Sequence, residues 1–140
     1  MRIITTKDEL ATLCQELTKE SFITIDLEFL REKTYYAKLC LIQVANSDVS
    51  AIIDPLSEKL ELSPFFDILK NPKITKVFHS GRQDIEILYL QSGFMPAPVF
   101  DTQIAAQVCG FGECVSYETL VYQICNISLD KSSRLSDWSI

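Results

Sequence analysis

A run of apolar and β-branched residues over positions 22–29 contains two carboxylates, Asp26 and Glu28. Alternate side chains of a β-strand lie on the same face, so both carboxylates would point the same way. Two like charges held that close repel unless a cation lies between them or one carboxyl takes up a proton. The pair therefore predicts half of a divalent-metal site. On the pair alone, a polar face at the end of an edge strand explains these residues equally well.

A third carboxylate, Asp84, follows Ser80-Gly81, which are typical of a helix start. The helix dipole favours a carboxylate in the first turn by about 0.3–1 kcal/mol, so a simple preference for acids at helix starts is the alternative explanation. Carboxylate oxygens suit Mg²⁺ or Mn²⁺ rather than zinc. Two such ions about 3.5–4 Å apart can activate a water and stabilise the leaving oxygen of a phosphodiester. Three converging carboxylates thus indicate nuclease chemistry.

Apolar periodicity and turn residues predict the elements that would position these carboxylates. Helices are expected over 6–17, 60–69, 82–91 and 101–108 and after residue 116, and strands over 22–29, 38–45, 49–54, 74–78 and 99–100. The first three strands would form an antiparallel start, with strands and helices alternating after them. This order predicts an α/β fold with a mixed β-sheet flanked by helices. With no internal repeat, low-complexity stretch or linker, residues 1–140 are expected to form a single domain.

The composition restricts the classes of function. The net charge of −6 argues against strong non-specific nucleic-acid binding, although Mg²⁺ or Mn²⁺ in a site would reverse the local sign. The five cysteines include no Cys-x-x-Cys and the chain has a single histidine, which argues against zinc and favours reduced cysteines packed in the core. No apolar run approaches the roughly 20 residues that cross a bilayer, and no signal peptide is recognisable. We therefore expect a cytoplasmic protein without a membrane partner.

The chain resembles the ribonuclease D family, which belongs to the DEDD 3′–5′ exonucleases with a ribonuclease H-like fold. The resemblance extends over nearly the whole chain in the family's order. It is carried by Ile25-Asp26-Leu27-Glu28-Phe29, Thr34-Tyr35-Tyr36 with Leu41-Ile42-Gln43, Ile53-Asp54-Pro55, His79-Ser80-Gly81-Arg82-Gln83-Asp84, Asp101-Thr102-Gln103, and Leu129-Asp130-Lys131-Ser132 with Ser136-Asp137-Trp138.

The resemblance implies a role for each carboxylate in a two-ion site for Mg²⁺ or Mn²⁺. Asp26 would bridge both metals, Glu28 would bind the metal on the nucleophile side, and Asp84 would hold the second metal, largely through water. The family commonly has threonine between the first two carboxylates, where this chain has Leu27. This difference alters a contact near the substrate terminus but removes no ligand.

Other residues of the same segments are candidate substrate contacts: Leu27, Phe29, His79, Arg82 and Gln83. Arg82 and Gln83 would touch the substrate backbone from the first turn of a helix. For His79, a structural hydrogen-bonding role is favoured over catalysis. Asp101 is expected to cap a helix rather than to bind metal.

The function implied by the resemblance is hydrolysis of RNA 3′ ends, such as those of tRNA precursors, to nucleoside 5′-monophosphates, with single-stranded DNA as a further possible substrate. The family's last motif, Tyr-x-x-x-Asp, would follow Trp138, and its helical RNA-binding domains would follow that motif, whereas the sequence ends at Ile140. One expectation is therefore a C-terminally incomplete domain with an impaired metal site. In that alternative the chain is a nucleic-acid- or protein-binding module, or a gene fragment, and its uncovered core favours self-association.

Overall fold

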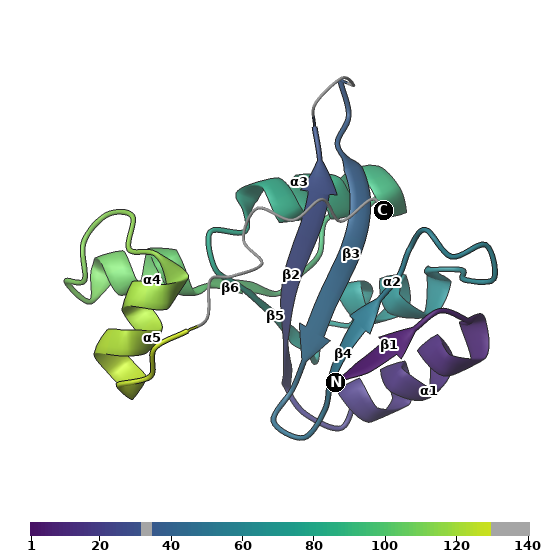
Figure 1. Cartoon of the computed structure of the whole chain (residues 1–140), viewed down its shortest axis with the longest axis horizontal. Helices are drawn as coiled ribbons and strands as arrows, with labels where there is room; N and C mark the ends of the chain where they lie inside the picture. Colours follow the sequence, from purple (N-terminus) through teal and green to yellow (C-terminus); the bar gives the residue numbers. More distant parts are fainter. Residues whose placement is uncertain (32–34, 130–140) are drawn as a thin grey trace.

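A computed structural model describes residues 1–31 and 35–129 of the chain (Figure 1). Its strands form a six-stranded mixed sheet in the order β1-β4-β3-β2-β5-β6. The strands are β1 (Arg2–Ile4), β2 (Phe22–Leu30), β3 (Lys38–Ala45), β4 (Ser50–Ile53), β5 (Thr75–Phe78) and β6 (Val99–Asp101). The helices are α1 (Lys7–Leu17), α2 (Ser63–Lys70), α3 (Arg82–Ser92), α4 (Thr102–Val108) and α5 (Tyr117–Cys125). The predicted α/β fold with a mixed sheet flanked by helices is confirmed.

Strand β2 lies inside the sheet, antiparallel to β3 and parallel to β5. β3 in turn pairs antiparallel with β4, so the predicted antiparallel three-strand start is confirmed. The turn between β3 and β4 is stabilised by Asn46, whose side-chain oxygen accepts hydrogen bonds from the amides of Asp48 and Val49 at 3.0 and 2.9 Å. The pairing of β2 with β3 shifts register between Glu28 and Phe29, as at a β-bulge.

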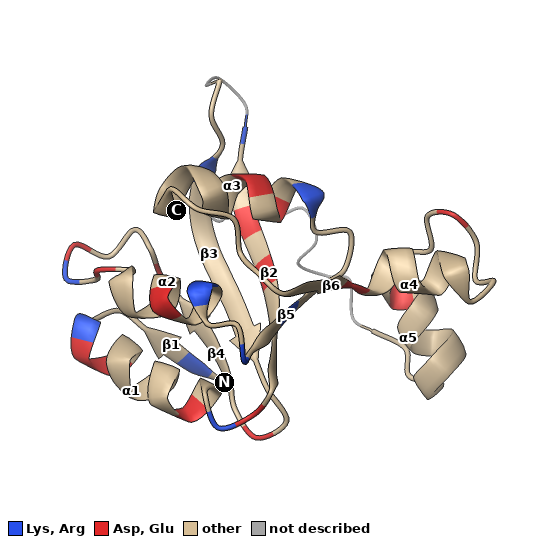
Figure 2. Ribbon diagram, turned by 180° about the vertical axis from the view of Figure 1, so that it is seen from behind, with Lys and Arg blue, Asp and Glu red and all other residues tan. Residues whose placement is uncertain are grey.

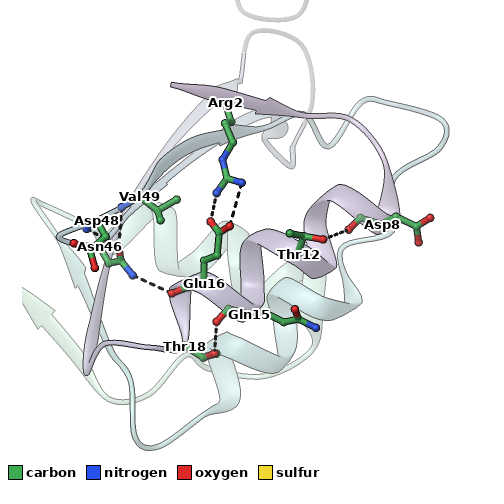
Figure 3. A network of polar contacts seen from close by, with 9 residues as sticks. All are labelled: Arg2, Asp8, Thr12, Gln15, Glu16, Thr18, Asn46, Asp48 and Val49. Atoms are coloured by element: carbon green, nitrogen blue, oxygen red, sulfur yellow. Dashed lines mark hydrogen bonds and ion pairs between the residues drawn. The ribbon is translucent and has the colours of Figure 1, made fainter.

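Strand β1 was not predicted, and it pairs parallel with β4 at one edge of the sheet. Figure 3 shows how it is tied to the helix that follows: Arg2 forms an ion pair with Glu16 of α1. The Asn46 side chain also donates a hydrogen bond to the backbone oxygen of Glu16, at 3.3 Å. The end of α1 is therefore joined to both β1 and the β3–β4 turn.

The main core joins the sheet to helices α1 and α2, and Ile87 and Leu88 of α3 belong to the same cluster. Thr6 caps α1 in a capping box with Glu9, as predicted, and Leu10, Leu13 and Leu17 are fully buried on its inner face. The inward-facing residues of β2 complete the same core, namely Ile23, Ile25 and Leu27. This alternation fixes which residues of β2 point to the opposite face.

Helices α4 and α5 project from the end of the sheet that carries β6 (Figure 1). Their buried residues form a separate cluster of Ala106, Val115 and Leu120. Three of the five cysteines lie exposed in this region (Cys109, Cys114 and Cys125), so the expectation of core cysteines is correct only for Cys14 and Cys40. The cause is the small size of this cluster, which leaves most of the two helices at the surface.

Within the described part of the chain, every helix is too short or too polar to cross a membrane. The predicted segment from Asp130 to Trp138 lies outside the described residues.

Candidate active site

Asp26 and Glu28 share the face of β2 opposite the buried side chains of Ile25 and Leu27. This is the same-face arrangement that the i, i+2 spacing predicted. Asp26 pairs across the sheet with Gln43 of β3, and Glu28 pairs with Leu41 just before the register shift. The bulge therefore follows the second carboxylate directly, at a position where bulges commonly re-aim side chains near active sites.

Asp84 reaches the same region from the first turn of α3. Figure 2 shows acidic positions on β2 and on α3 lying next to each other. Although Asp84 is an ionisable residue, only 8% of its surface is exposed. Burial and the nearby charge of Asp26 raise its pKa to about 7, against an opposing hydrogen bond from the Leu27 amide. The three residues Asp26, Glu28 and Asp84 are called the carboxylate cluster below.

The pKa values of the other two members of the carboxylate cluster are also raised. Loss of hydration raises the pKa of Asp26, although much of the residue remains exposed. A hydrogen bond from the Leu27 amide and, to a smaller extent, the nearby His79 ring oppose this shift. Burial, and then the charge of Asp26, raise the pKa of Glu28. Each carboxylate is thus harder to ionise than usual, which is the electrostatic condition that a bound cation relieves.

The donor chemistry of the carboxylate cluster fits Mg²⁺ or Mn²⁺, because carboxylate oxygens are hard ligands. Across residues 1–31 and 35–129, however, no three histidine, cysteine, aspartate or glutamate side chains are gathered closely enough to form a ready-made metal site. The assignment of these residues as metal ligands stays a prediction.

His79, at the end of β5, is held by hydrogen bonds at both ring nitrogens. Nδ1 lies 2.8 Å from Oγ1 of Thr102, and Nε2 lies 2.9 Å from the backbone oxygen of Val115. A carbonyl oxygen can only accept, so Nε2 carries a proton. His79 therefore has the structural hydrogen bonds that the sequence favoured, and its contact with substrate stays a prediction.

The remaining candidate substrate contacts differ in their placement. Arg82 and Gln83 are exposed in the first turn of α3, beside Asp84. The Leu27 side chain is buried in the core, on the face opposite the carboxylates, and Phe29 packs partly buried against the same core. The Leu27 amide is hydrogen-bonded to Asp84, so contact of Leu27 with a substrate stays a prediction.

A groove of about 430 Å³ opens over the sheet face that carries Asp26. Asp26 and His79 lie on its wall together with Gln43 from β3 and Tyr117 from α5. The groove gives a ligand access to Asp26 along the face opposite α1 and α2.

Asp101 is the helix cap that the sequence predicted, since its side chain accepts a hydrogen bond from the Gln103 amide at 2.9 Å. The structure adds two hydrogen bonds that the sequence did not reveal, from the amides of Ser80 and Gly81. Desolvation opposes ionisation of Asp101, but the hydrogen bonds from backbone amides together lower its pKa. The sequence held only an indirect sign of these hydrogen bonds. Gly81 begins α3 and has no side chain that could cap the helix, so a cap from another element is needed.

Comparison with known proteins agrees with this architecture. A family model described as 3′–5′ exonuclease matches residues 1–140. Ribonuclease D of Jannaschia sp. (strain CCS1) is 53% identical over 140 residues, which cover 97% of this chain and 36% of that protein. The crystal structure of Escherichia coli RNase D, described as an exoribonuclease involved in structured RNA processing, has a TM-score of 0.94 and 39% identity, over 99% of this chain and 37% of that one.

The catalytic core of RRP6 from Trypanosoma brucei has a TM-score of 0.89 and 28% identity, over 99% of this chain and 39% of that one. The chain spans about a third of the length of the curated relatives it matches. The similarity to the RNase D structure extends over the whole sheet and its helices, which confirms the predicted ribonuclease H-like fold. The chain belongs to the 3′–5′ exonuclease family, and within that family it is similar to the ribonucleases D.

Proposed function

We propose that this chain is the exonuclease domain of a metal-dependent 3′–5′ exoribonuclease that shortens RNA from its 3′ end. The observation that carries the proposal is the carboxylate cluster, in which Asp26 and Glu28 share one face of β2 and the charge of Asp26 adds to burial in raising the pKa values of Glu28 and of Asp84 on α3. The similarity to RNase D, described as an exoribonuclease involved in structured RNA processing, supports RNA as the substrate. The natural targets that we propose are the 3′ ends of tRNA precursors in the cytoplasm. Single-stranded DNA is a weaker candidate substrate, since the same chemistry would hydrolyse its phosphodiester bonds.

The residues of the site divide the work of binding and hydrolysis. Asp26, Glu28 and Asp84 would hold divalent cations, Mg²⁺ or Mn²⁺. Such ions, when bound, supply activation of a water and stabilisation of the leaving 3′ oxygen, so that nucleoside 5′-monophosphates are released. Arg82 and Gln83, exposed beside Asp84, would contact the substrate phosphates.

Three further positions would shape the substrate end of the site. The Leu27 backbone and the partly buried Phe29 would contact the terminal nucleotide where β2 bulges. His79 would line the groove from a fixed orientation, because both its nitrogens are hydrogen-bonded.

The test is the shortening of a 5′-labelled single-stranded RNA in Mn²⁺ or Mg²⁺ by the wild-type chain and two variants. Asp26→Asn removes the central charge of the carboxylate cluster, and we expect the rate to fall by ~100-fold or more, equivalent to about 3 kcal/mol of transition-state stabilisation. Asp67→Asn is the matched control, because Asp67 is exposed on α2 and distant in sequence from the site. It is expected to retain the wild-type rate.

Each result of this assay decides between the two interpretations. Metal-dependent trimming that Asp26→Asn abolishes and Asp67→Asn leaves intact supports the exonuclease. RNA binding without trimming in either metal contradicts it and supports a binding module. Trimming that is equal in wild type and Asp26→Asn would contradict the assignment of the site.

A further inference from the structure

The turn between β5 and α3, which carries Asp84 into the carboxylate cluster, is strained and closely packed. Ser80 has a φ of +57°, in the left-handed region that residues other than glycine rarely adopt. Gly81 follows, and a Cβ built there would lie 2.4 Å from the Cβ of Phe78. A turn with these two features holds its shape only if the surrounding structure fixes it.

Helix α3 has no side-chain cap of its own. Gly81 occupies the N-cap position, and the first helical hydrogen bond runs from the Ile85 amide to the Gly81 oxygen at 2.8 Å. Free amides at a helix start need acceptors from elsewhere. The start of α3 therefore depends on a group from another element.

Asp101, 20 residues further along the chain, supplies that group. One of its carboxylate oxygens accepts from the Ser80 amide at 2.9 Å, and the other accepts from the Gly81 amide, also at 2.9 Å. The oxygen that bonds to Ser80 also accepts from the Gln103 amide and so caps α4. One carboxylate thus fixes the starts of two helices, and the hydrogen bonds are charge-assisted, which makes them stronger than neutral ones.

We propose that Asp101 is a positioning residue for the metal centre, acting through the Ser80-Gly81 turn to hold Asp84 opposite Asp26. Asp84 lies three residues after Gly81, within the first turn of α3, so a displacement of the turn is transmitted to it. Misplacement of a reacting group by about 1 Å is enough to cost ~100-fold in rate. This inference rests on the proposed function, because it assigns Asp101 a role in the same site.

The decisive variant is Asp101→Ser, and the measurement is Mn²⁺ affinity of the full 140-residue chain, followed by the EPR signal of free Mn²⁺. Serine is also a good N-cap, so α4 retains its cap, but its single short hydroxyl cannot bond to both Ser80 and Gly81. The matched control is Thr6→Ala, which removes a cap of the same kind from α1 and leaves the start of α3 untouched. Urea unfolding of each variant reports whether the fold is retained.

We expect Asp101→Ser to weaken Mn²⁺ binding by ~10-fold or more, in the range seen when outer-shell partners of metal ligands are removed. Thr6→Ala should leave the affinity within about twofold of wild type, although it also destabilises the fold. If a folded Asp101→Ser variant binds Mn²⁺ with wild-type affinity, the positioning role of Asp101 is wrong, whereas the proposed function is unaffected. If the wild-type chain itself binds no Mn²⁺, the proposed function fails, and this inference fails with it.

A second variant covers the case in which Asp101→Ser does not unfold cooperatively. Asp101→Asn retains one acceptor oxygen, for Ser80 and Gln103, and turns an amide nitrogen towards the Gly81 amide. A threefold or greater loss of Mn²⁺ affinity in this variant supports the inference. An unchanged affinity overturns it.

Discussion

Ionisation of Asp84, a member of the carboxylate cluster, works against folding. In an unfolded chain its carboxyl has its usual pKa near 3.8, whereas burial and then the charge of Asp26 raise its pKa to about 7 in the folded protein. Between these values the folded state binds more protons than the unfolded state, so this residue's contribution to stability falls as pH rises. The contribution is fully present below pH 3.8 and is lost as pH rises through about 7.

Replacing this carboxyl with an amide should therefore stabilise the protein under alkaline conditions. Asp84→Asn is expected to add on the order of 1–2 kcal/mol at pH 8 in EDTA, a rise in Tm of roughly 3–8 °C, and to change little at pH 3.5. Thermal unfolding followed by circular dichroism at both pH values measures the effect, with Asp67→Asn as the exposed control. A lower Tm for Asp84→Asn at pH 8 would show that the charged form of Asp84 stabilises the fold.

Lys76 of β5 is a second buried charge, outside the carboxylate cluster. It is fully buried, and its Nζ donates hydrogen bonds to the backbone oxygens of Asn71 at 2.7 Å and Ala97 at 2.8 Å. Burial lowers its pKa from 10.5 to about 8. The unfolded chain therefore binds more protons between pH 8 and 10.5, and stability attributable to Lys76 rises with pH across that window.

The variant Lys76→Met tests both consequences of this burial. It leaves the Ala97 carbonyl without a donor and removes one of the two donors to the Asn71 carbonyl, which keeps the Ile74 amide, and it is expected to destabilise the protein by about 1–3 kcal/mol at pH 7. Urea unfolding from pH 7 to 10 should also show a smaller rise in stability with pH than in wild type. An unchanged pH dependence would mean that Lys76 keeps an ordinary pKa in the folded protein.

At the scale of elements, the β5–α3 turn is where backbone geometry limits the sequence most tightly. Gly81→Ala places a Cβ against Phe78, so the turn must shift, and we expect a loss of about 1–3 kcal/mol. Ser80→Gly is the matched control, because glycine adopts the positive φ of residue 80 freely, and it should stay within about 0.5 kcal/mol of wild type. Urea unfolding of the two variants compares them, and a neutral Gly81→Ala would contradict the close approach.

Elements with strong local patterns were predictable from the sequence, and those that depend on distant partners were not. The predicted strand over 38–45 coincides with β3, and the Thr6–Glu9 capping box was recognised from residues three apart. Strand β1 has only three residues, too few for any periodicity, and it exists because β4 pairs with it. The same reasoning applies to the site: the shared face of Asp26 and Glu28 follows from strand geometry, whereas the burial of Asp84 depends on how α3 packs beside β2.

For the molecule as a whole, the two separate core clusters predict that different parts of the chain differ in their free energy of local unfolding. The main cluster joins α1, α2 and α3 to the sheet, whereas α4 and α5 share a small cluster of Ala106, Val115 and Leu120. Few buried apolar contacts mean a lower free energy of local unfolding. Amide hydrogen exchange should therefore show protection in α5 at least ~2 kcal/mol below that in β2 and β3.

The matched comparison for this prediction is within the molecule, since α1 has a similar length to α5 but lies against the main core. Protection in α1 should follow the global unfolding free energy. Equal protection in α1 and α5 would show that the two clusters unfold as one cooperative unit.

The hydrogen bonds of His79 link this uneven stability to the groove beside Asp26. The ring is attached on one side to Thr102 of α4 and on the other to Val115, in the segment that leads into α5. If the α4–α5 unit opens on its own, both attachments are released together while β2 and β3 remain folded. Tyr117 of α5 would then leave the wall of the groove, and His79 at the end of β5 would lose its fixed orientation, so access to Asp26 would follow the local stability of α4 and α5 rather than that of the sheet.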